Sequence, residues 1–249
     1  MIIVKNLNKS FNGRKVLSDI NVTFETGITN LIIGQSGSGK TVLLKSIVGL
    51  HDIDSGEVWF DDVLFNKLDF RQKKEIRKQM GMLFQGSALF DSITVEQNVR
   101  FPLDMFTNMT MKEKTRRVNF CLERVNIINA NKMYPAELSG GMKKRVAIAR
   151  AIALNPKYLL CDEPNSGLDP ITANLIDKLI KEITEEYSIT TIINTHDMNS
   201  VMEIGEKVIF ISDGLKYWEG NKNEILHSDC KLLNDFVFAN VLAKQLINK

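Results

Sequence analysis

The chain has 249 residues, 44% of them hydrophobic and 25% charged, which excludes a disordered or fibrous protein. Its 32 lysines and arginines nearly balance 30 acidic residues, leaving a net charge of +2, so the overall charge gives no reason to expect nucleic-acid binding. The cysteines, Cys121, Cys161 and Cys230, lack metal-ligand spacing, and we expect free, buried thiols in a reducing compartment. We expect neither a signal peptide nor a membrane span, because no run approaches about 18 apolar residues.

Strands dominate the first part of the chain. Residues 1–7 and 16–25 flank the turn pair Asn12-Gly13, which predicts a β-hairpin because both turn positions need positive φ. The continuous apolar run 28–34 is of strand length and suits a strand buried on both faces. The alternating segment 56–65 predicts a second hairpin that turns at Asp61-Asp62.

Helical patterns begin near Thr94. The sequences TVEQ from Thr94 and TMKE from Thr110 are capping boxes that predict helix starts. The second helix would carry an apolar face of Val118, Cys121, Leu122 and Val125. Beyond residue 138 the pattern runs helix, strand (158–162), helix, strand (189–194), and the third element carries Leu175, Ile176, Leu179, Ile180 and Ile183. This alternation predicts an α/β fold with a parallel sheet covered on both faces, interrupted by a helical insert at about 91–135.

The most specific motif is GQSGSGKT, from Gly34 to Thr41, which lies between the buried strand and a helical segment. It satisfies the P-loop pattern in the strand-to-helix context that the pattern requires. Its glycines leave backbone N–H groups free to wrap a phosphate, and the following helix adds the positive end of its dipole. Lys40 can reach the β- and γ-phosphates, and Thr41 can ligate Mg²⁺. The sequence therefore predicts a nucleoside triphosphate site.

Other polar residues follow apolar strands. Asp162 and Glu163 end the segment YLLCDE, where Asp162 would help hold Mg²⁺ and Glu163 would polarise the attacking water. An acidic pair at this place is also typical of a helix cap or a solvated turn. Gln85 and His196 each follow an apolar run, and either can instead be an ordinary surface or core residue. The segment NSGLDP, 165–170, can be a plain turn before a proline.

A second helix tip suggests another anion site. Ser139 is a plausible N-cap, and Gly140 and Gly141 expose the N–H groups of the first turn of the helix MKKRVAIARAIAL. One full P-loop and two such tips indicate that the second tip serves the nucleotide of another subunit. The alternative is an ordinary capped helix on which Lys143, Lys144 and Arg145 form a solvated face.

These motifs, in this order, resemble those of the ATP-binding cassette (ABC) ATPases over roughly residues 1–220. GQSGSGKT resembles their Walker A motif, Gln85 their Q-loop, LSGGM their signature, YLLCDE their Walker B, SGLD their D-loop and His196 their switch histidine. The resemblance implies a P-loop NTPase core with an antiparallel β subdomain and a helical subdomain, followed by an extension at 221–249. It also implies a head-to-tail homodimer that sandwiches two ATP molecules between one chain's Walker A and the other's signature.

The resemblance assigns a role to each matching residue. Catalysis falls to Glu163, His196 and Gln85, and Mg²⁺ to Thr41, Gln85 and Asp162. Phe11 stands where the family usually stacks adenine on a tyrosine, although it can equally be a core aromatic. Asn165 replaces the commoner Thr or Ser before the D-loop. The ATP contacts implied are Phe11, Gly34, Gln35, Ser36, Gly37, Ser38, Gly39, Lys40, Thr41, Val42, Ser139, Gly140, Gly141 and Asp169.

A finer resemblance concerns the cargo. LSGGMKKRVAIARA and the segment 82–103 are similar to the ATPase of the Mla/Mce-type bacterial lipid transporters, where Met142 replaces the usual Gln or Glu. The family's membrane subunits insert a coupling helix after the Q-loop, and Leu89, Phe90, Ile93 and Val95 are candidates to line that groove, with core positions as the alternative. In Mla-type ATPases a C-terminal tail such as NDFVFANVLAKQLINK can clasp the neighbouring ATPase.

The sequence thus predicts a peripheral ATPase on the cytoplasmic face of a bacterial inner membrane, powering phospholipid transport through separate permease subunits. Lipid-binding accessory subunits are expected partners and nucleic acid is not. Two alternatives stay open. One is a soluble ABC ATPase of iron–sulfur cluster assembly or an ABC transporter for another substrate. The other is a non-transport ABC protein of DNA or ribosomes, disfavoured by the single P-loop and the lack of sustained heptads.

Overall fold

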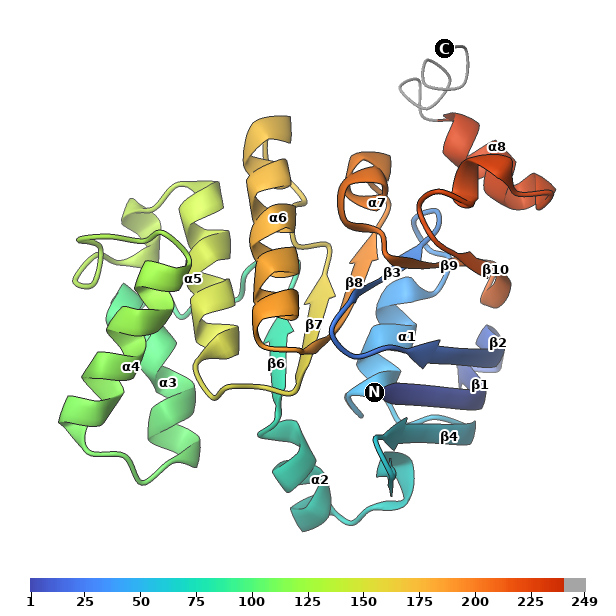
Figure 1. Cartoon of the computed structure of the whole chain (residues 1–249). Coiled ribbons are helices and arrows are strands. Elements are labelled where there is room, and N and C mark those ends of the chain that lie inside the picture. The colour runs from blue at the N-terminus through green and yellow to red at the C-terminus, as the bar shows by residue number, and fades with distance from the viewer. Residues whose placement is uncertain (240–249) are drawn as a thin grey trace.

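The computed structural model describes residues 1–239, which form two β-sheets and a group of helices beside the larger sheet (Figure 1). Within this range no helix is both long and apolar enough to span a membrane. The amphipathic character predicted for residues 234–249 falls mostly outside the described residues, because residues 240–249 are not among them.

The smaller sheet is antiparallel and has the strand order β2-β1-β4-β5. Strands β1 (Ile2–Phe11) and β2 (Arg14–Phe24) pair across a turn in which Asn12 has φ 49° and Gly13 φ 77°. Strands β4 (Ser55–Phe60) and β5 (Val63–Leu64) pair across Asp61-Asp62. Both predicted hairpins are confirmed, because the short polar side chains of Asn and Asp tolerate the left-handed backbone of a tight turn.

The larger sheet has the order β10-β9-β3-β8-β7-β6. All of its strand pairs except β9–β10 are parallel. The predicted strands at 28–34, 158–162 and 189–194 are confirmed as β3 (Thr29–Ile33), β7 (Tyr158–Asp162) and β8 (Thr190–Thr195), every residue of which is buried. The sheet also contains β6 (Met80–Leu83), β9 (Lys207–Ser212) and β10 (Leu215–Gly220).

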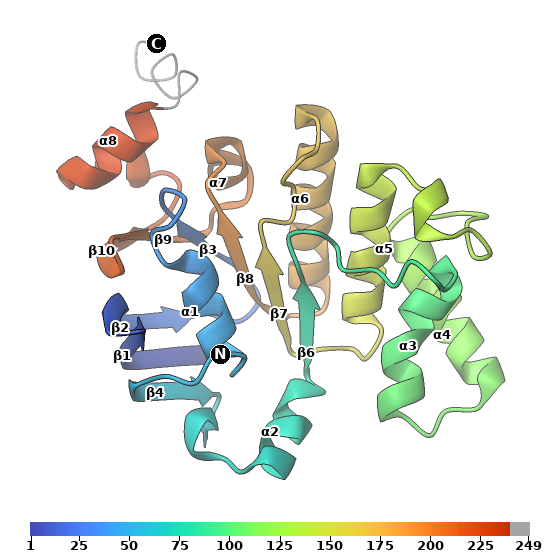
Figure 2. The ribbon, with the colours of Figure 1, turned by 180° about the vertical axis from the view of Figure 1, so that it is seen from behind.

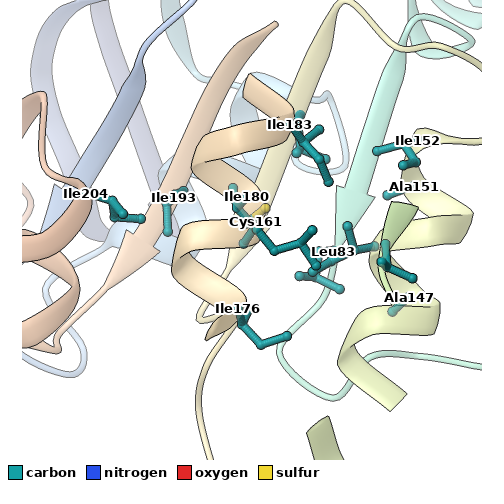
Figure 3. Close-up of a cluster of buried hydrophobic side chains, with 14 of the residues drawn as sticks. Leu83, Ala147, Ala151, Ile152, Cys161, Ile176, Ile180, Ile183, Ile193 and Ile204 are labelled. Atoms are coloured by element: carbon teal, nitrogen blue, oxygen red, sulfur yellow. The ribbon is translucent and has the colours of Figure 1, made fainter. Parts of the chain in front are cut away.

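Alternate residues of the central strands enter two different cores. Leu31 and Ile33 of β3 face a core formed with α5 (Gly140–Ile152), α6 (Pro170–Glu186) and α7 (Met198–Ile204), and Figure 3 shows part of that core. Ile32 faces a second core, in which α1 (Lys40–Ile47) lies between the two sheets (Figure 2). A strand buried on both faces needs apolar residues at successive positions, as the run LII provides.

The helical insert lies beside α5, at the edge of the molecule in Figure 1. Thr94 and Thr110 cap α3 (Val95–Phe106) and α4 (Met111–Arg124) with complete capping boxes, as predicted. The predicted face of α4 is buried in full. Remaining elements are η1 (Phe65–Lys67), α2 (Phe70–Arg77), η2 (Pro135–Glu137), η3 (Ile225–His227) and α8 (Lys231–Ala239).

Two details differ from the sequence prediction. On α6, Ile176, Leu179, Ile180 and Ile183 are buried, but Leu175 is 48% exposed because it lies at the edge of that stripe. Cys121 and Cys161 are free and buried as expected, whereas Cys230 is free but only half-buried. Burial raises the pKa of the Cys121 thiol to about 11, so this thiol stays protonated and unreactive near neutral pH.

A polar network ties α6 to α7 in the interior. The Asn165 amide donates to Asp177 at 3.2 Å and to the Ser200 hydroxyl at 2.7 Å. Asp177 is 2% exposed, and its second oxygen, Oδ1, has no hydrogen-bond partner within residues 1–239. Burial raises the pKa of Asp177 to about 6, while the hydrogen bond to Ser200 opposes this shift. The protonated form of this carboxyl group is therefore favoured more in the folded protein than in the unfolded chain.

We predict that Asp177→Asn stabilises the protein at neutral pH. Because the pKa rises from 3.8 to about 6 on folding, wild-type stability falls as pH increases from about 4 to about 6 and then levels off. The neutral amide keeps the acceptor for Asn165 and avoids the buried charge, for a gain of about 1–3 kcal/mol above pH 7. Urea unfolding of both proteins at pH 4 and pH 7.5 measures the difference, which should vanish at pH 4. An equal difference at both pH values would contradict this prediction.

Candidate functional site

Four parallel strands deliver the predicted site residues to one edge of the larger sheet. Gly34 follows β3, Gln85 follows β6, Glu163 follows β7 and His196 follows β8. Because the carboxyl ends of parallel strands meet at the same edge, residues up to 162 positions apart in sequence become neighbours. This edge lies at the amino end of α1 (Figure 2).

The glycine-rich loop between β3 and α1 has backbone that side chains would not allow. Gly34 has φ 151°, and a Cβ atom there would lie 2.1 Å from the carbonyl oxygen of Ile211. Gly39, the N-cap of α1, has φ 106°, and a Cβ atom there would lie 2.9 Å from Cδ2 of Leu17. Glycine is the residue that adopts both conformations without steric cost. The loop therefore presents its backbone at the start of a helix, which is the arrangement that binds phosphate.

Lys40 is folded back over this loop. Its ammonium donates to the carbonyl oxygens of Gly34 and Gln35, both at 2.8 Å, and the residue is only 5% exposed. Burial lowers the pKa of Lys40, and the nearby carboxylates of Glu163 and Asp162 counteract that shift. The two hydrogen bonds thus hold the Lys40 ammonium in place beside the glycine-rich loop.

Oxygen atoms suited to Mg²⁺ lie next to Lys40. The Thr41 hydroxyl donates to Oδ1 of Asp162 at 2.9 Å, and the Asn194 amide donates to the same atom at 3.1 Å. Asp162 is 5% exposed. Carboxylate and hydroxyl oxygens are the ligands that Mg²⁺ prefers beside substrate phosphates, so this pair fits the ion.

Glu163 is the centre of the remaining polar contacts. Gln85 Nε2 donates to one carboxylate oxygen at 2.9 Å, and His196 Nδ1 lies 3.0 Å from the other. The backbone of Glu163 has φ 47°, a strained conformation for a non-glycine residue that is common at functional sites. The structure therefore brings together Gln85, Glu163 and His196, the three residues to which the resemblance assigns catalysis.

A cavity of about 420 Å³ opens between these groups. Its lining includes the glycine loop, Lys40, Thr41, Val42 and the Gln85–Glu163–His196 group. The hydroxyl of Ser38, 6% exposed, has no hydrogen-bond partner among the described residues. A buried hydroxyl without a partner is costly, but Ser38 is not among the residues that line the cavity. The Lys40 ammonium and the backbone of the glycine loop are the donors that fit a nucleotide phosphate.

The signature residues are not part of this cavity. Ser139 caps α5 by accepting from Met142 N at 3.3 Å, and Ser139 and Gly140 are exposed. A Cβ atom at Gly141 would lie 2.6 Å from the Thr172 side chain, so glycine lets α5 approach α6. Asp169 caps α6 through the amides of Ile171 and Thr172. None of residues 138–142 or Asp169 lines the cavity of its own chain.

Phe11 also lies outside that lining, which contains Val16 instead. The Phe11 ring is 38% exposed and packs edge-on against His51, with the ring centroids 5.2 Å apart. The Lys9 ammonium lies 4.9 Å from the ring centroid. The alternative of a core aromatic is therefore wrong, because the ring remains at the surface.

The sequence analysis missed two cations on α5. Lys144 is not part of a solvated face: it is 4% exposed and donates to the Gln85 carbonyl and, at 3.4 Å, to the Glu163 carbonyl. Arg150 donates to the carbonyls of Ser87 and Ala88 at 2.9 and 2.8 Å. A charged residue in a run of charged residues usually points to solvent. The apolar spacing of α5, which places Val146, Ala147 and Ile148 inside, was the available signal.

A groove of about 490 Å³ lies beside the Gln85 loop. Of the four residues predicted to line it, only Phe90 does so. Val95 is completely buried, Leu89 packs against the core, and Ile93 is not part of the lining. The other aromatic lining residues are Phe84, which follows β6, and Phe101 and Phe106 on α3, and the sequence pattern did not assign these positions to a surface. The groove is lined mainly by Met80, Met82, Phe84, Ala88, Phe90, Phe101, Pro102, Phe106 and Leu154.

The phosphate loop, the acidic strand end and the fold together define an ATPase of the ATP-binding cassette class. The chain matches the ABC transporter family over residues 17–166. It belongs to that family, as an ATP-binding subunit.

Solved structures agree with this class. The chain is similar to the ATP-binding cassette MJ0796 in a dimeric post-hydrolysis state bound to ADP and Pi, with TM-score 0.81 and 33% identity over 89% of this chain and 99% of that one. It is also similar to cbiO1 from Clostridium perfringens, part of the ABC transporter complex cbiONQ, with TM-score 0.85 and 29% identity over 100% and 98% of the two chains.

The names of the curated relatives state different transported substrates. The chain is 40% identical to the methionine import ATP-binding protein MetN of Carboxydothermus hydrogenoformans, over 99% of this chain and 74% of that protein. It is 39% identical to the intermembrane phospholipid transport system ATP-binding protein MlaF of Haemophilus influenzae, over 92% and 86%. The shared feature is the ATP-binding subunit of a transporter.

Proposed function

We propose that this protein is a peripheral ATPase at the cytoplasmic face of the inner membrane, where two copies power phospholipid movement through separate permease subunits. The observation that carries the proposal is the group of Lys40, Glu163, Gln85 and His196 around one cavity of about 420 Å³, with Asp162 bound to Thr41 beside it. Groups of this kind position a nucleotide and the water that attacks it. ATP is the expected nucleotide.

The proposed roles follow from the contacts. The loop from Gly34 to Val42 wraps the phosphates, and Lys40 exchanges its two carbonyl contacts for phosphate oxygens. Thr41, Gln85 and Asp162 would hold Mg²⁺, which when bound neutralises charge on the phosphates. Glu163 accepts a proton from the attacking water. Gln85 and His196 orient its two carboxylate oxygens.

We predict that Glu163→Gln binds ATP but does not hydrolyse it. The amide has nearly the same shape, so the phosphate site is unchanged, but it cannot accept the proton. Calorimetry should give an ATP affinity within about threefold of wild type, and phosphate release should fall about 10²- to 10⁴-fold. ATP should then hold two chains together in size-exclusion chromatography. Hydrolysis at the wild-type rate would assign the proton acceptor elsewhere.

The second half of each site is proposed to come from the partner chain. Ser139, Gly140 and Gly141 form a helix tip that is exposed at Ser139 and Gly140 and has no part in the cavity of its own chain. The positive end of a helix dipole favours an anion, and the nucleotide of a head-to-tail partner would supply one. Asp169, exposed at the start of α6, and Phe11, exposed beside His51, are proposed to contact the same nucleotide from the D-loop and the adenine side.

A mixture of two inactive variants tests this geometry. Lys40→Ala removes the phosphate cation, and Ser139→Arg obstructs the tip, so each homodimer has two defective sites. In a mixed head-to-tail dimer one site carries both defects and the other carries none. We therefore predict that the mixture regains ATPase activity, up to about a quarter of wild type for random pairing of independent sites. Ser139→Arg alone should still bind ATP as a monomer, and normal hydrolysis by this variant would refute the composite site.

The groove beside the Gln85 loop is the proposed contact with the permease. Phe90, Phe101 and Phe106 are each 38–43% exposed around it. Exposed aromatic groups gathered in one groove are typical of a protein interface. Because the groove adjoins Gln85, a helix bound there would sense the state of the site. Lipid-binding accessory subunits would attach through the permease.

Phospholipid is the proposed cargo, supported by the signature sequence LSGGMKKR and the similarity to MlaF. Methionine is the second candidate, because MetN proteins are among the most similar relatives. We predict that the complex purified from native membranes and reconstituted in vesicles transfers labelled phospholipid when ATP is added. ATP-dependent methionine uptake without lipid transfer would replace phospholipid with methionine as the cargo.

Two matched variants test the proposed contact between the groove and the permease. Phe101→Asp places a charge in the groove and should release the permease during purification. Phe120→Asp places the same charge at a phenylalanine of similar exposure, 42% against 39%, on α4. It should keep the permease, because Phe120 does not line the groove.

A further inference from the structure

Helix α5 carries two cations that hold the loop after β6. Lys144 donates to the carbonyl of Gln85, and Arg150 donates to the carbonyls of Ser87 and Ala88. In Figure 2 this connection leaves β6 and passes α5 on its way to α3. Both cations meet backbone carbonyls and not carboxylates, so they fix the course of the loop whatever its side chains are.

The loop held in this way has unfavourable backbone geometry. Ser87 has φ 64° and Ala88 φ 48°, and two successive non-glycine residues in the left-handed region are costly. Such a conformation persists only where surrounding contacts enforce it. The Arg150 guanidinium donates a hydrogen bond to the carbonyl oxygen of each of these two residues, and these bonds supply that constraint.

Lys144 closes a ring of contacts around Glu163. Its ammonium reaches the carbonyl of Gln85 and, at 3.4 Å, the carbonyl of Glu163. The Gln85 side chain in turn donates to the Glu163 carboxylate at 2.9 Å. Backbone and side chain of both residues are therefore fixed relative to one buried cation, which is only 4% exposed.

Burial lowers the pKa of Lys144, and the nearby Cys161, Glu163 and Asp162 only partly offset this shift. The first turn of the same helix is the exposed tip that includes Ser139 and Gly140. One rigid element thus carries the tip at its start and the Lys144 ammonium about one turn further on.

We propose that Lys144 is a positioning residue for ATP hydrolysis. It holds Gln85 and Glu163 in fixed positions relative to each other, and it links those positions to the start of α5 at Ser139 and Gly140. Lys144 does not line the cavity and contacts the carbonyls of Gln85 and Glu163, so its contribution lies in the orientation of the Glu163 carboxylate. The proposal depends on the ATPase reaction and not on the cargo. A failure of the transport experiment therefore leaves it intact.

The test compares Lys144→Met with Lys144→Arg in steady-state hydrolysis by the whole chain. Met has similar length without the charge, and we expect kcat to fall about 10- to 100-fold. The KM and calorimetric Kd for ATP should stay within about threefold, because the phosphate loop is untouched. Arg restores a buried donor to both carbonyls and should recover most of kcat. Lys178→Met, a loss of an exposed lysine on α6, should leave kcat unchanged.

Thermal melting separates positioning from a structural role. If Met and Arg lose activity equally and in proportion to a lower melting temperature, Lys144 is structural and the proposal is overturned. Wild-type kcat in folded Lys144→Met overturns it as well. Should Lys144→Met not fold, Lys144→Gln decides in its place: reduced kcat at unchanged KM supports the proposal, and a changed KM at unchanged kcat refutes it.

Discussion

The arrangement of the site residues depends on the burial of the larger sheet on both of its faces. Helix α1 and the smaller sheet cover one face, and α5, α6 and α7 cover the other. Helical connections of this kind return each strand to the same starting edge, so all the strands β3, β6, β7 and β8 end at the opposite one. The site is therefore a consequence of the topology. Polar residues that follow these strands lie beside one another because the strands end at the same edge of the sheet.

Much of this could be read from the sequence because the physical signals were local. Burial on both faces demands consecutive apolar residues in β3, and the turn at Asn12-Gly13 demands residues that tolerate positive φ. The capping boxes at Thr94 and Thr110 are satisfied within four residues. The P-loop signal was equally local, because the backbone conformation of the loop itself requires its glycines.

The unpredicted features depend on contacts between distant segments. Lys144 is buried because the carbonyls of Gln85 and Glu163 lie beside α5. The apolar spacing of α5 indicates which face of the helix is buried, but not that these carbonyls lie against it. Val95 was a candidate for the groove but belongs to the core, since the capping box at Thr94 turns its first helical residue inward. Phe11 remained ambiguous for the same reason: whether a ring at a hairpin end is covered depends on a segment 40 residues away, at His51.

The balance of charge explains why such a site would need a nucleotide, a metal ion and a partner together. Two buried ammonium groups, Lys40 and Lys144, face two carboxylates, Asp162 and Glu163. The group is nearly neutral by itself, as a site of low dielectric requires. A triphosphate brings several negative charges into this space, and Lys40 alone cannot offset them. Mg²⁺ held at Thr41 and Asp162 would supply two positive charges, and the helix tip of a second chain would add a partial one. The proposed closure of two chains around ATP would then be favoured by electrostatics and reversed once phosphate leaves.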